Sequence, residues 1–191
     1  MCLGVKISYS NIPDIAIGEG TISVLFKAVG LKSFHQACDY VWRLPYGRTS
    51  EPYQFKTVLS ESRGTCSSKH ALLKLLADEN GVEVELVVGL YPMKESNTPG
   101  VGVVLDKYGY KFIPEAHCYL NFRGSRVDLT RFGSEAVEEI NDFFIEVPVR
   151  PQKLAKVKPE MHRQFLVEKY GEGQVASVWQ IREECIAALS T

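Results

Sequence analysis

Apolar residues recur at helical spacing in the first half of the chain. Their spacing predicts three helices, over residues 20–29, 33–44 and 66–79. Ser33 offers an N-cap for the second helix, and Pro45 ends it. The third helix begins after Thr65 and stops at Asn80, which a glycine follows. Its leucines cover more than one stripe, so we expect this helix to be buried on most sides.

Alternating apolar and polar residues predict strands in the middle of the chain. From Val82 to Leu90, valine and leucine alternate at first with glutamate, which is typical of a strand that is half buried at its start. Four further strands are predicted, over residues 101–105, 116–122, 125–129 and 143–149. Arg123 and Gly124 form a two-residue turn between the second and third of these, so that pair is expected to be a hairpin.

The character of the sequence changes after Arg150. Residues 151–159 are rich in proline and lysine, which is typical of a connector. Two helices are predicted to follow, over residues 160–170 and 174–189. The last helix carries Val178, Trp179 and Ile186 on its apolar side, so we expect it to pack on the core or on a second subunit.

This order of elements predicts the fold class and the domain organisation. Helices followed by antiparallel strands favour an α+β fold over a βαβ sheet. The length of 191 residues supports one domain with a substantial core and a small extension. We therefore predict a main domain with N-terminal helices over residues 1–150, and a C-terminal helical extension over residues 151–191 docked on the same domain.

Composition and charge narrow the function classes. The chain is 45% hydrophobic and 24% charged, with a formal net charge of -1, which gives no electrostatic reason to expect nucleic-acid binding. Polar residues from Lys6 to Asp14 interrupt the N-terminal apolar residues, so we expect neither a signal peptide nor a membrane span. The five cysteines are widely spaced without a CxxC pair, which favours reduced thiols and a cytoplasmic location.

Cys66 is the cysteine whose setting favours a thiolate. It is predicted to begin a helix, where the backbone dipole and the first N–H groups stabilise negative charge and can bind an oxyanion. Arg63 lies just upstream and Lys69 lies one turn along, and both add positive potential. A nucleophilic cysteine also needs an imidazole that moves protons and a group that orients this imidazole.

The predicted hairpin supplies both partners. With a two-residue turn, Phe122 pairs with Ser125, and His117 and Asp128 then share a face as diagonal neighbours. Such neighbours lie about 7–8 Å apart along the backbone, which a His–Asp hydrogen bond can span. We therefore predict a catalytic triad of Cys66, His117 and Asp128.

The two segments that carry these residues resemble the transglutaminase-like superfamily. RGTCSSKHALLKLLADENGVEVELVVGL is similar to its nucleophile segment, and EAHCYLNFRGSRVDLT is similar to its His and Asp segment. The resemblance covers roughly residues 34–130. It implies a papain-like core in which the Cys66 helix packs on an antiparallel sheet that carries His117 and Asp128. It also implies that residues 1–150 are a catalytic domain of the bacterial cysteine protease or hydrolase type.

The resemblance implies acyl transfer through a thioester, with a peptide or protein amide as substrate and with no cofactor or metal. Hydrolysis by water is favoured, as in a protease or amidase, while an amine acceptor would give a transglutaminase. Two alternatives stay open: an arylamine N-acetyltransferase, and a binding module with this fold that no longer catalyses. The oligomeric state is left open as well.

Other candidate residues have structural interpretations. Cys118 is expected to point into the core, opposite to His117, and a zinc site built from Cys66, His70, His117 and Cys118 is disfavoured for that reason. Glu115 shares a strand face with His117, and a solvent-exposed role is favoured for it. Four side chains upstream of the nucleophile are candidates for a second oxyanion donor: Tyr46, Tyr53, Gln54 and Ser60. Structural or surface roles are favoured for Cys2, Cys38, Cys185, His35 and His162.

Overall fold

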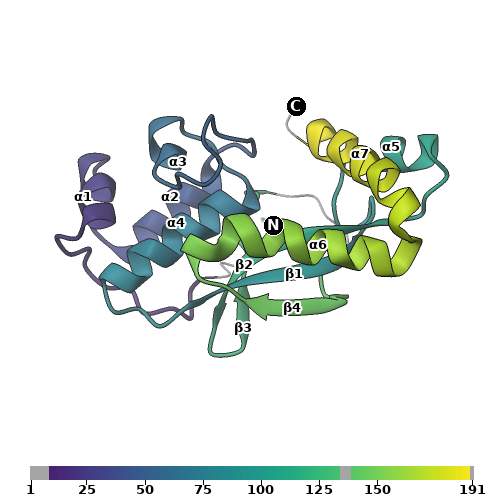
Figure 1. The fold of residues 1–191 in the computed structure, drawn as a ribbon. Coiled ribbons are helices and arrows are strands. Elements are labelled where there is room, and N and C mark those ends of the chain that lie inside the picture. Colours follow the sequence, from purple (N-terminus) through teal and green to yellow (C-terminus); the bar gives the residue numbers. More distant parts are fainter. Residues whose placement is uncertain (1–8, 134–138, 190–191) are drawn as a thin grey trace, which may run out of the picture. The chain divides into compact units, whose positions relative to one another are not determined.

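The computed structural model describes residues 9–133 and 139–189 (Figure 1). Its α-helices are α1 (Thr21–Ala28), α2 (Phe34–Arg43), α3 (Thr57–Ser60), α4 (Cys66–Glu79), α5 (Gly102–Lys107), α6 (Leu154–Tyr170) and α7 (Glu172–Ala188). Its strands are β1 (Glu85–Met93), β2 (Ile113–Phe122), β3 (Ser125–Val127) and β4 (Ile145–Pro148). The strands form one antiparallel sheet in the order β3-β2-β1-β4, so the protein belongs to the predicted α+β class.

Contacts divide the chain into two compact units. The first unit comprises Met1–Val87, Cys118–Gly133 and Pro148–Pro151. The second unit comprises Val88–His117, Ser134–Val147 and Gln152–Thr191. Strands β1 and β2 therefore each contribute residues to both units. The sequence-based division into residues 1–150 and 151–191 stays a prediction.

Helix α4 is the central helix of the first unit. It contacts α1, α2 and α3, and it lies beside α2 in Figure 1. Nine of its 14 residues are buried, among them Leu72, Leu73 and Leu76, which confirms the burial predicted from its leucines. Its start is fixed by a capping box in which Thr65 Oγ1 accepts a hydrogen bond from Ser68 N and Ser68 Oγ accepts one from Thr65 N.

The other end of α4 anchors the first helix of the chain. The Glu79 carboxylate accepts hydrogen bonds from the backbone N–H groups of Ile22 and Ser23 and from the Ser23 hydroxyl. These donors lie in the first turn of α1, whose N–H groups have no partners within the helix. The Glu79 carboxylate therefore caps α1 in place of Gly20, whose N-cap position lacks a side-chain hydrogen bond.

The hairpin between β2 and β3 has the predicted register. Phe122 pairs with Ser125, and the ladder continues to Leu120 and Val127. Arg123 and Gly124 have positive φ angles of 50° and 82°, which is the geometry of a type I′ turn. β3 is shorter than the predicted strand over residues 125–129.

The second unit has a core of its own. Helix α7 packs on α5 and α6, and its buried residues join two apolar clusters. The first cluster contains Tyr91, Met93, Val101, Leu105, Ile113, Ile181, Cys185 and Ile186. The second contains Leu166, Val175 and Val178, with Trp179 partly buried against it. The predicted apolar side of the last helix is therefore packed within this unit.

Two segments differ from the sequence-based predictions. The predicted strand over residues 101–105 is α5, because Val101 and Leu105 share one helix face and are buried while Val103 is 84% exposed. The predicted connector over residues 151–159 is a 3₁₀ turn (Pro151–Lys153) followed by the first turns of α6. Pro159 cannot donate a backbone hydrogen bond within α6, which destabilises the helix. The burial of Leu154 in the first turn of α6 contributes stabilising free energy that offsets this loss.

Strand β1 also starts later than predicted, at Glu85, and it is buried on both faces from Leu86 to Tyr91. Within the described residues, no helix combines the length and apolar character that crossing a lipid bilayer requires.

Candidate active site

Cys66 is the first residue of α4, as the sequence predicts. The first N–H groups of any helix lack partners within that helix and carry the positive end of its dipole. Thr65 adopts the extended N-cap conformation and fixes the direction in which the chain enters the helix. Cys66 is 6% exposed, and its Sγ lies 3.9 Å from Ser67 Oγ. The setting is therefore one that favours a thiolate, in a largely buried position.

Lys69 brings a buried positive charge to the same end of α4. Its side chain is fully buried, and Nζ donates hydrogen bonds to the carbonyl oxygens of Leu44 at 2.6 Å and Thr130 at 2.8 Å. Burial lowers the pKa of Lys69 to about 8, although interactions with Asp128 and Cys66 oppose that change. The ammonium thus lies within electrostatic reach of both residues. Arg63, by contrast, is exposed and pairs with Glu61 at 2.9 Å.

His70 is the next residue of α4, and it too is fully buried. Its Nδ1 lies 2.8 Å from the Cys66 carbonyl oxygen, which can only accept a hydrogen bond. Its Nε2 accepts a hydrogen bond from Leu129 N at 2.7 Å. These two partners fix the neutral tautomer with the proton on Nδ1.

Asp128 immediately follows β3. Its Oδ1 accepts hydrogen bonds from Thr130 N at 3.0 Å and from the Thr130 hydroxyl at 2.6 Å. The same oxygen lies 3.8 Å from His70 Nε2, but both atoms are acceptors there, so the contact is not a hydrogen bond. The Asp128 side chain is 31% exposed. Asp128 thus belongs to a turn whose backbone the α4 side chains contact.

His117 lies in β2 and is 7% exposed. Its ring meets the Tyr91 ring edge-on, with centroids 5.8 Å apart. The hairpin register that relates His117 to Asp128 is confirmed as far as Leu120 and Val127, one residue short of Asp128. Cys66 and Asp128 belong to the first unit and are linked through the side chains of α4. The contacts of His117 with Cys66 and Asp128 stay a prediction.

Glu115 corrects one interpretation of the sequence. Its side chain is buried, and it forms a two-pronged ion pair with Arg182, with Nε and Nη2 at 2.6 and 2.7 Å from its oxygens. Burial by itself raises the pKa of Glu115, but the charge and hydrogen bonds of Arg182 outweigh it and hold this pKa below its usual value. The expected solvent-exposed role is wrong because α7 brings Arg182 to this strand.

The remaining cysteines are buried where the structure describes them. Cys118 is fully buried, as predicted, and its Sγ lies 3.4 Å from Ser67 Oγ. Burial raises the pKa of Cys38, and it raises that of Cys185 to about 11. Cys2 lies outside the described residues. Cys66 is therefore the most exposed of the four cysteines that are described.

The candidates for a second oxyanion donor differ in their positions. Tyr53, Gln54 and Ser60 are exposed, and the Ser60 hydroxyl donates to Thr57 O at 3.3 Å. Tyr46 pairs through its backbone with Gly64, two residues before Cys66, and the Arg131 guanidinium lies 5.0 Å from its ring centre. Tyr46 is thus the candidate that the chain holds beside the approach to the nucleophile.

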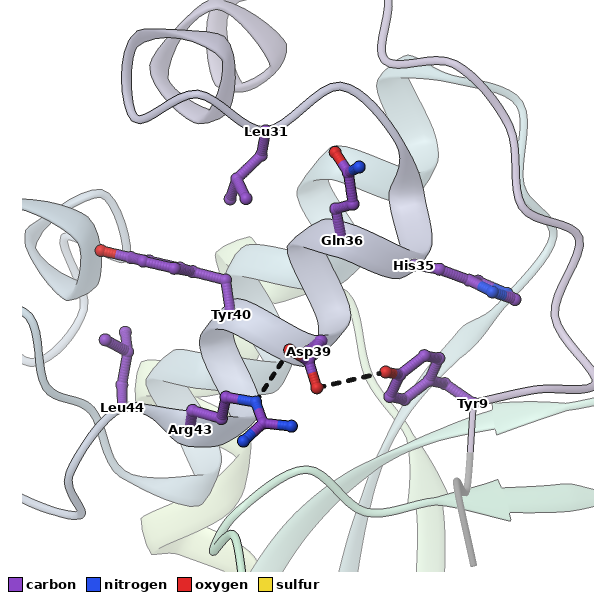
Figure 2. Close-up of a pocket in the computed structure, with 8 residues that line it drawn as sticks. All are labelled: Tyr9, Leu31, His35, Gln36, Asp39, Tyr40, Arg43 and Leu44. Atoms are coloured by element: carbon purple, nitrogen blue, oxygen red, sulfur yellow. Dashed lines mark hydrogen bonds and ion pairs between the residues drawn. The ribbon is translucent and has the colours of Figure 1, made fainter.

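A separate pocket of about 460 Å³ lies along the outer face of α2 (Figure 2). It is lined by Tyr9, Leu31, His35, Gln36, Asp39, Tyr40, Arg43 and Leu44. Asp39 lies between two of these side chains, accepting hydrogen bonds from Tyr9 Oη at 3.4 Å and Arg43 Nε at 2.8 Å. Burial and the Asp39 charge raise the pKa of Tyr9 to about 12. None of the three predicted triad residues lines this pocket.

In residues 9–133 and 139–189, no group of three or more His, Cys, Asp or Glu side chains is arranged to hold a metal ion. Sequence reasoning gave His70 only a disfavoured zinc role, whereas both of its ring nitrogens contact the backbone. The position of His70 one helical turn after Cys66 was the feature of the sequence that could have indicated this role.

Comparison of the chain with protein-family models, curated proteins and solved structures gives no significant match.

Proposed function

We propose that this protein is a cysteine-nucleophile acyl-transfer enzyme with a transglutaminase-like, papain-like core. Cys66 is the nucleophile, His117 is the general acid and base, and Asp128 orients the imidazole. The observation that carries the proposal is the position of Cys66 at the first residue of a capped helix, with the buried Lys69 ammonium one turn away. Both features favour a thiolate at this cysteine.

The reaction begins when the Cys66 thiolate attacks the carbonyl carbon of an amide. N–H groups at the start of α4 stabilise the oxyanion of the tetrahedral intermediate. The His117 imidazolium then protonates the departing amine, the C–N bond breaks, and a thioester with Cys66 forms. Neutral His117 next removes a proton from water, the resulting hydroxide attacks the thioester, and the carboxylic acid and the Cys66 thiolate are released.

The substrate class that fits this chemistry is a peptide bond or a glutamine side-chain amide. Hydrolysis is favoured because water is always available, and an amine acceptor in place of water would make a new amide. We also propose that residues 151–191 extend the catalytic domain. The packing of α7 on α5, and the ion pair of Arg182 with Glu115, support that arrangement.

Selective alkylation tests the proposed nucleophile. An ordinary thiol has a pKa of about 8.5 and is almost wholly protonated at pH 6. We expect iodoacetamide at pH 6 to label Cys66 much faster than the other four cysteines, and His117→Ala to slow that labelling while the protein stays folded. Mass spectrometry of partly labelled protein identifies the site, and circular dichroism checks the fold. Equal labelling of several cysteines would exclude an activated thiol at Cys66.

One observation favours a second candidate, a binding module with the same fold and no activity. Cys66 is only 6% exposed, so a large substrate would need more access than this side chain presents. Labelling by a thiol-reactive amide analogue distinguishes the two functions. Asp128→Ala adds a second test, since an enzyme should lose far more turnover than stability when the imidazole loses its orienting group.

A further inference from the structure

Two consecutive side chains of α4 hold the turn that contains Asp128. Lys69 Nζ donates to Thr130 O at 2.8 Å, and His70 Nε2 accepts from Leu129 N at 2.7 Å. Both side chains are fully buried. The turn is also braced from within, because Thr130 donates twice to Asp128 Oδ1. The backbone on the C-terminal side of Asp128 is therefore fixed to α4 at two successive residues.

The same side chains reach back to other parts of the first unit. His70 Nδ1 donates to the carbonyl of Cys66, so this ring spans the distance between the first residue of α4 and Leu129. Lys69 also donates to Leu44 O at 2.6 Å and to Trp42 O at 3.4 Å, at the end of α2. One ammonium thus joins α2, α4 and the Asp128 turn.

Burying the Lys69 ammonium and the His70 imidazole costs free energy unless their polar atoms form hydrogen bonds. An ammonium removed from water needs hydrogen-bond partners, and here three backbone carbonyls provide them. Three ionisable side chains act on the charge of Lys69: Asp128 and Cys66 favour the positive charge when they are ionised, and Arg131 opposes it. A leucine would fill this interior without that cost, but it would not join the three segments.

We propose that Lys69 and His70 are positioning residues that hold the Asp128 turn against the N-terminus of α4, and thereby fix the orienting carboxylate relative to the Cys66 nucleophile. The inference rests on the proposed function for the roles of Cys66 and Asp128. Lys69 has an additional electrostatic effect, since its positive charge favours the thiolate over the thiol at Cys66.

The test follows the alkylation rate of Cys66 by iodoacetamide as a function of pH. Lys69→Met should move the midpoint of this profile up by about one pH unit, which reduces the rate by roughly tenfold at pH values below both midpoints, and the profile should converge with wild type at high pH. Lys74→Met is the matched control, because Lys74 lies on the same helix and pairs with Asp78. It should leave the whole profile within about twofold of wild type, since a surface pair has little effect.

Two His70 variants separate the two hydrogen bonds of the ring, and they decide the matter if Lys69→Met does not fold. His70→Gln can place an oxygen near the former Nε2 and accept from Leu129 N, whereas His70→Asn can keep the donor to the Cys66 carbonyl but cannot reach Leu129. We expect His70→Asn to lower the alkylation rate at pH 6 and His70→Gln to retain most of it. In an Asp128→Ala background the His70→Asn effect should disappear, because the residues then act through one group.

The outcomes distinguish this inference from the proposed function. If wild-type Cys66 does not react selectively at pH 6, the proposed function fails, and amide exchange at Leu129 still measures whether His70 holds the turn. If wild-type Cys66 reacts but Lys69→Met and both His70 variants keep its full profile, the positioning role is wrong. An effect of His70→Asn that persists unchanged without Asp128 would also overturn it.

Discussion

The buried ion pair between Glu115 and Arg182 makes the strongest prediction about stability. Replacing Arg182 with methionine keeps most of the side-chain volume and removes the charge. The Glu115 side chain is 6% exposed, so its carboxylate would be left buried without its cationic partner. Breaking a buried pair from one side typically costs about 3–5 kcal/mol. For a chain of this length, that loss corresponds to a fall in melting temperature of roughly 10 °C.

The stability difference between wild type and Arg182→Met should also depend on pH, which a loss of packing alone would not produce. In the wild type, the lowered pKa of Glu115 means that its contribution to stability is present at neutral pH and is lost as pH falls through that pKa. In Arg182→Met, burial without a partner should raise the pKa of Glu115. As pH falls, Glu115 is then protonated at a higher pH in the variant than in the wild type, and protonation removes the destabilising buried charge. The difference in the free energy of unfolding should therefore be largest near pH 7 and shrink towards pH 4.

Urea unfolding followed by circular dichroism at pH 7 and pH 4 measures this difference. Glu183→Gln is the matched control, because Glu183 also pairs with Arg182 but is 38% exposed. We expect this control to lose at most about 1 kcal/mol. The double variant Glu115→Gln/Arg182→Met should recover part of the loss, since it removes the buried charge as well. A loss in Arg182→Met equal to that in Glu183→Gln, or independent of pH, would refute the reasoning.

Three further predictions concern other parts of the chain. Burial lowers the pKa of Lys69 from 10.5 to about 8, so keeping this residue charged destabilises the folded protein below pH 8. This cost is relieved between about pH 8 and 10.5. The free energy of unfolding relative to Lys69→Met should therefore rise over that window by up to about 3 kcal/mol, measured by urea titration. Leu73→Ala should cost about 2–5 kcal/mol by thermal melt because Leu73 is fully buried, whereas Val103→Ala, at 84% exposure, should stay within about 0.5 kcal/mol. Gly89→Ala should cost about 1–3 kcal/mol because the new methyl group would overlap the Phe143 ring, and a smaller side chain at Phe143 should recover part of that loss in the same melt.

Where local signals agree with the period of the apolar residues, the sequence predicts the fold well. The bounds of α4 follow from its cap residues and leucines, and the β2–β3 register follows from a two-residue turn ending in glycine. The predictions over residues 101–105 and 151–159 were wrong for two different reasons. A short apolar run has no decisive period, and a proline near a helix start is a weak signal when tertiary packing favours the helix.

In the candidate site, too, the features set by neighbouring residues could be predicted from the sequence, and those set by residues far along the chain could not. The position of Cys66 at a helix start is local, and the sequence predicts it. The burial of Glu115 depends on Arg182, 67 residues away, and the burial of Lys69 depends on carbonyls of residues 42, 44 and 130. The sequence around Glu115 and Lys69 contains no pattern that predicts these distant partners. A charged residue is therefore expected to be solvent-exposed until the packing is known.

These two buried charges lie on the elements that carry the predicted nucleophile and base. Lys69 is three residues after Cys66 on α4, and Glu115 is two residues before His117 on β2. Each charge is compensated within its own unit, Lys69 by three carbonyls and Glu115 by Arg182. Apolar residues of similar volume would often be at least as stable in such positions, so stability alone is a weak reason for a chain to bury them. Directional hydrogen bonds do fix the helix and the strand in ways that apolar contacts cannot. We therefore expect the double variant Glu115→Gln/Arg182→Met to recover part of the stability that Arg182→Met loses, and Lys69→Met, whose partners are backbone carbonyls, to slow the alkylation of Cys66.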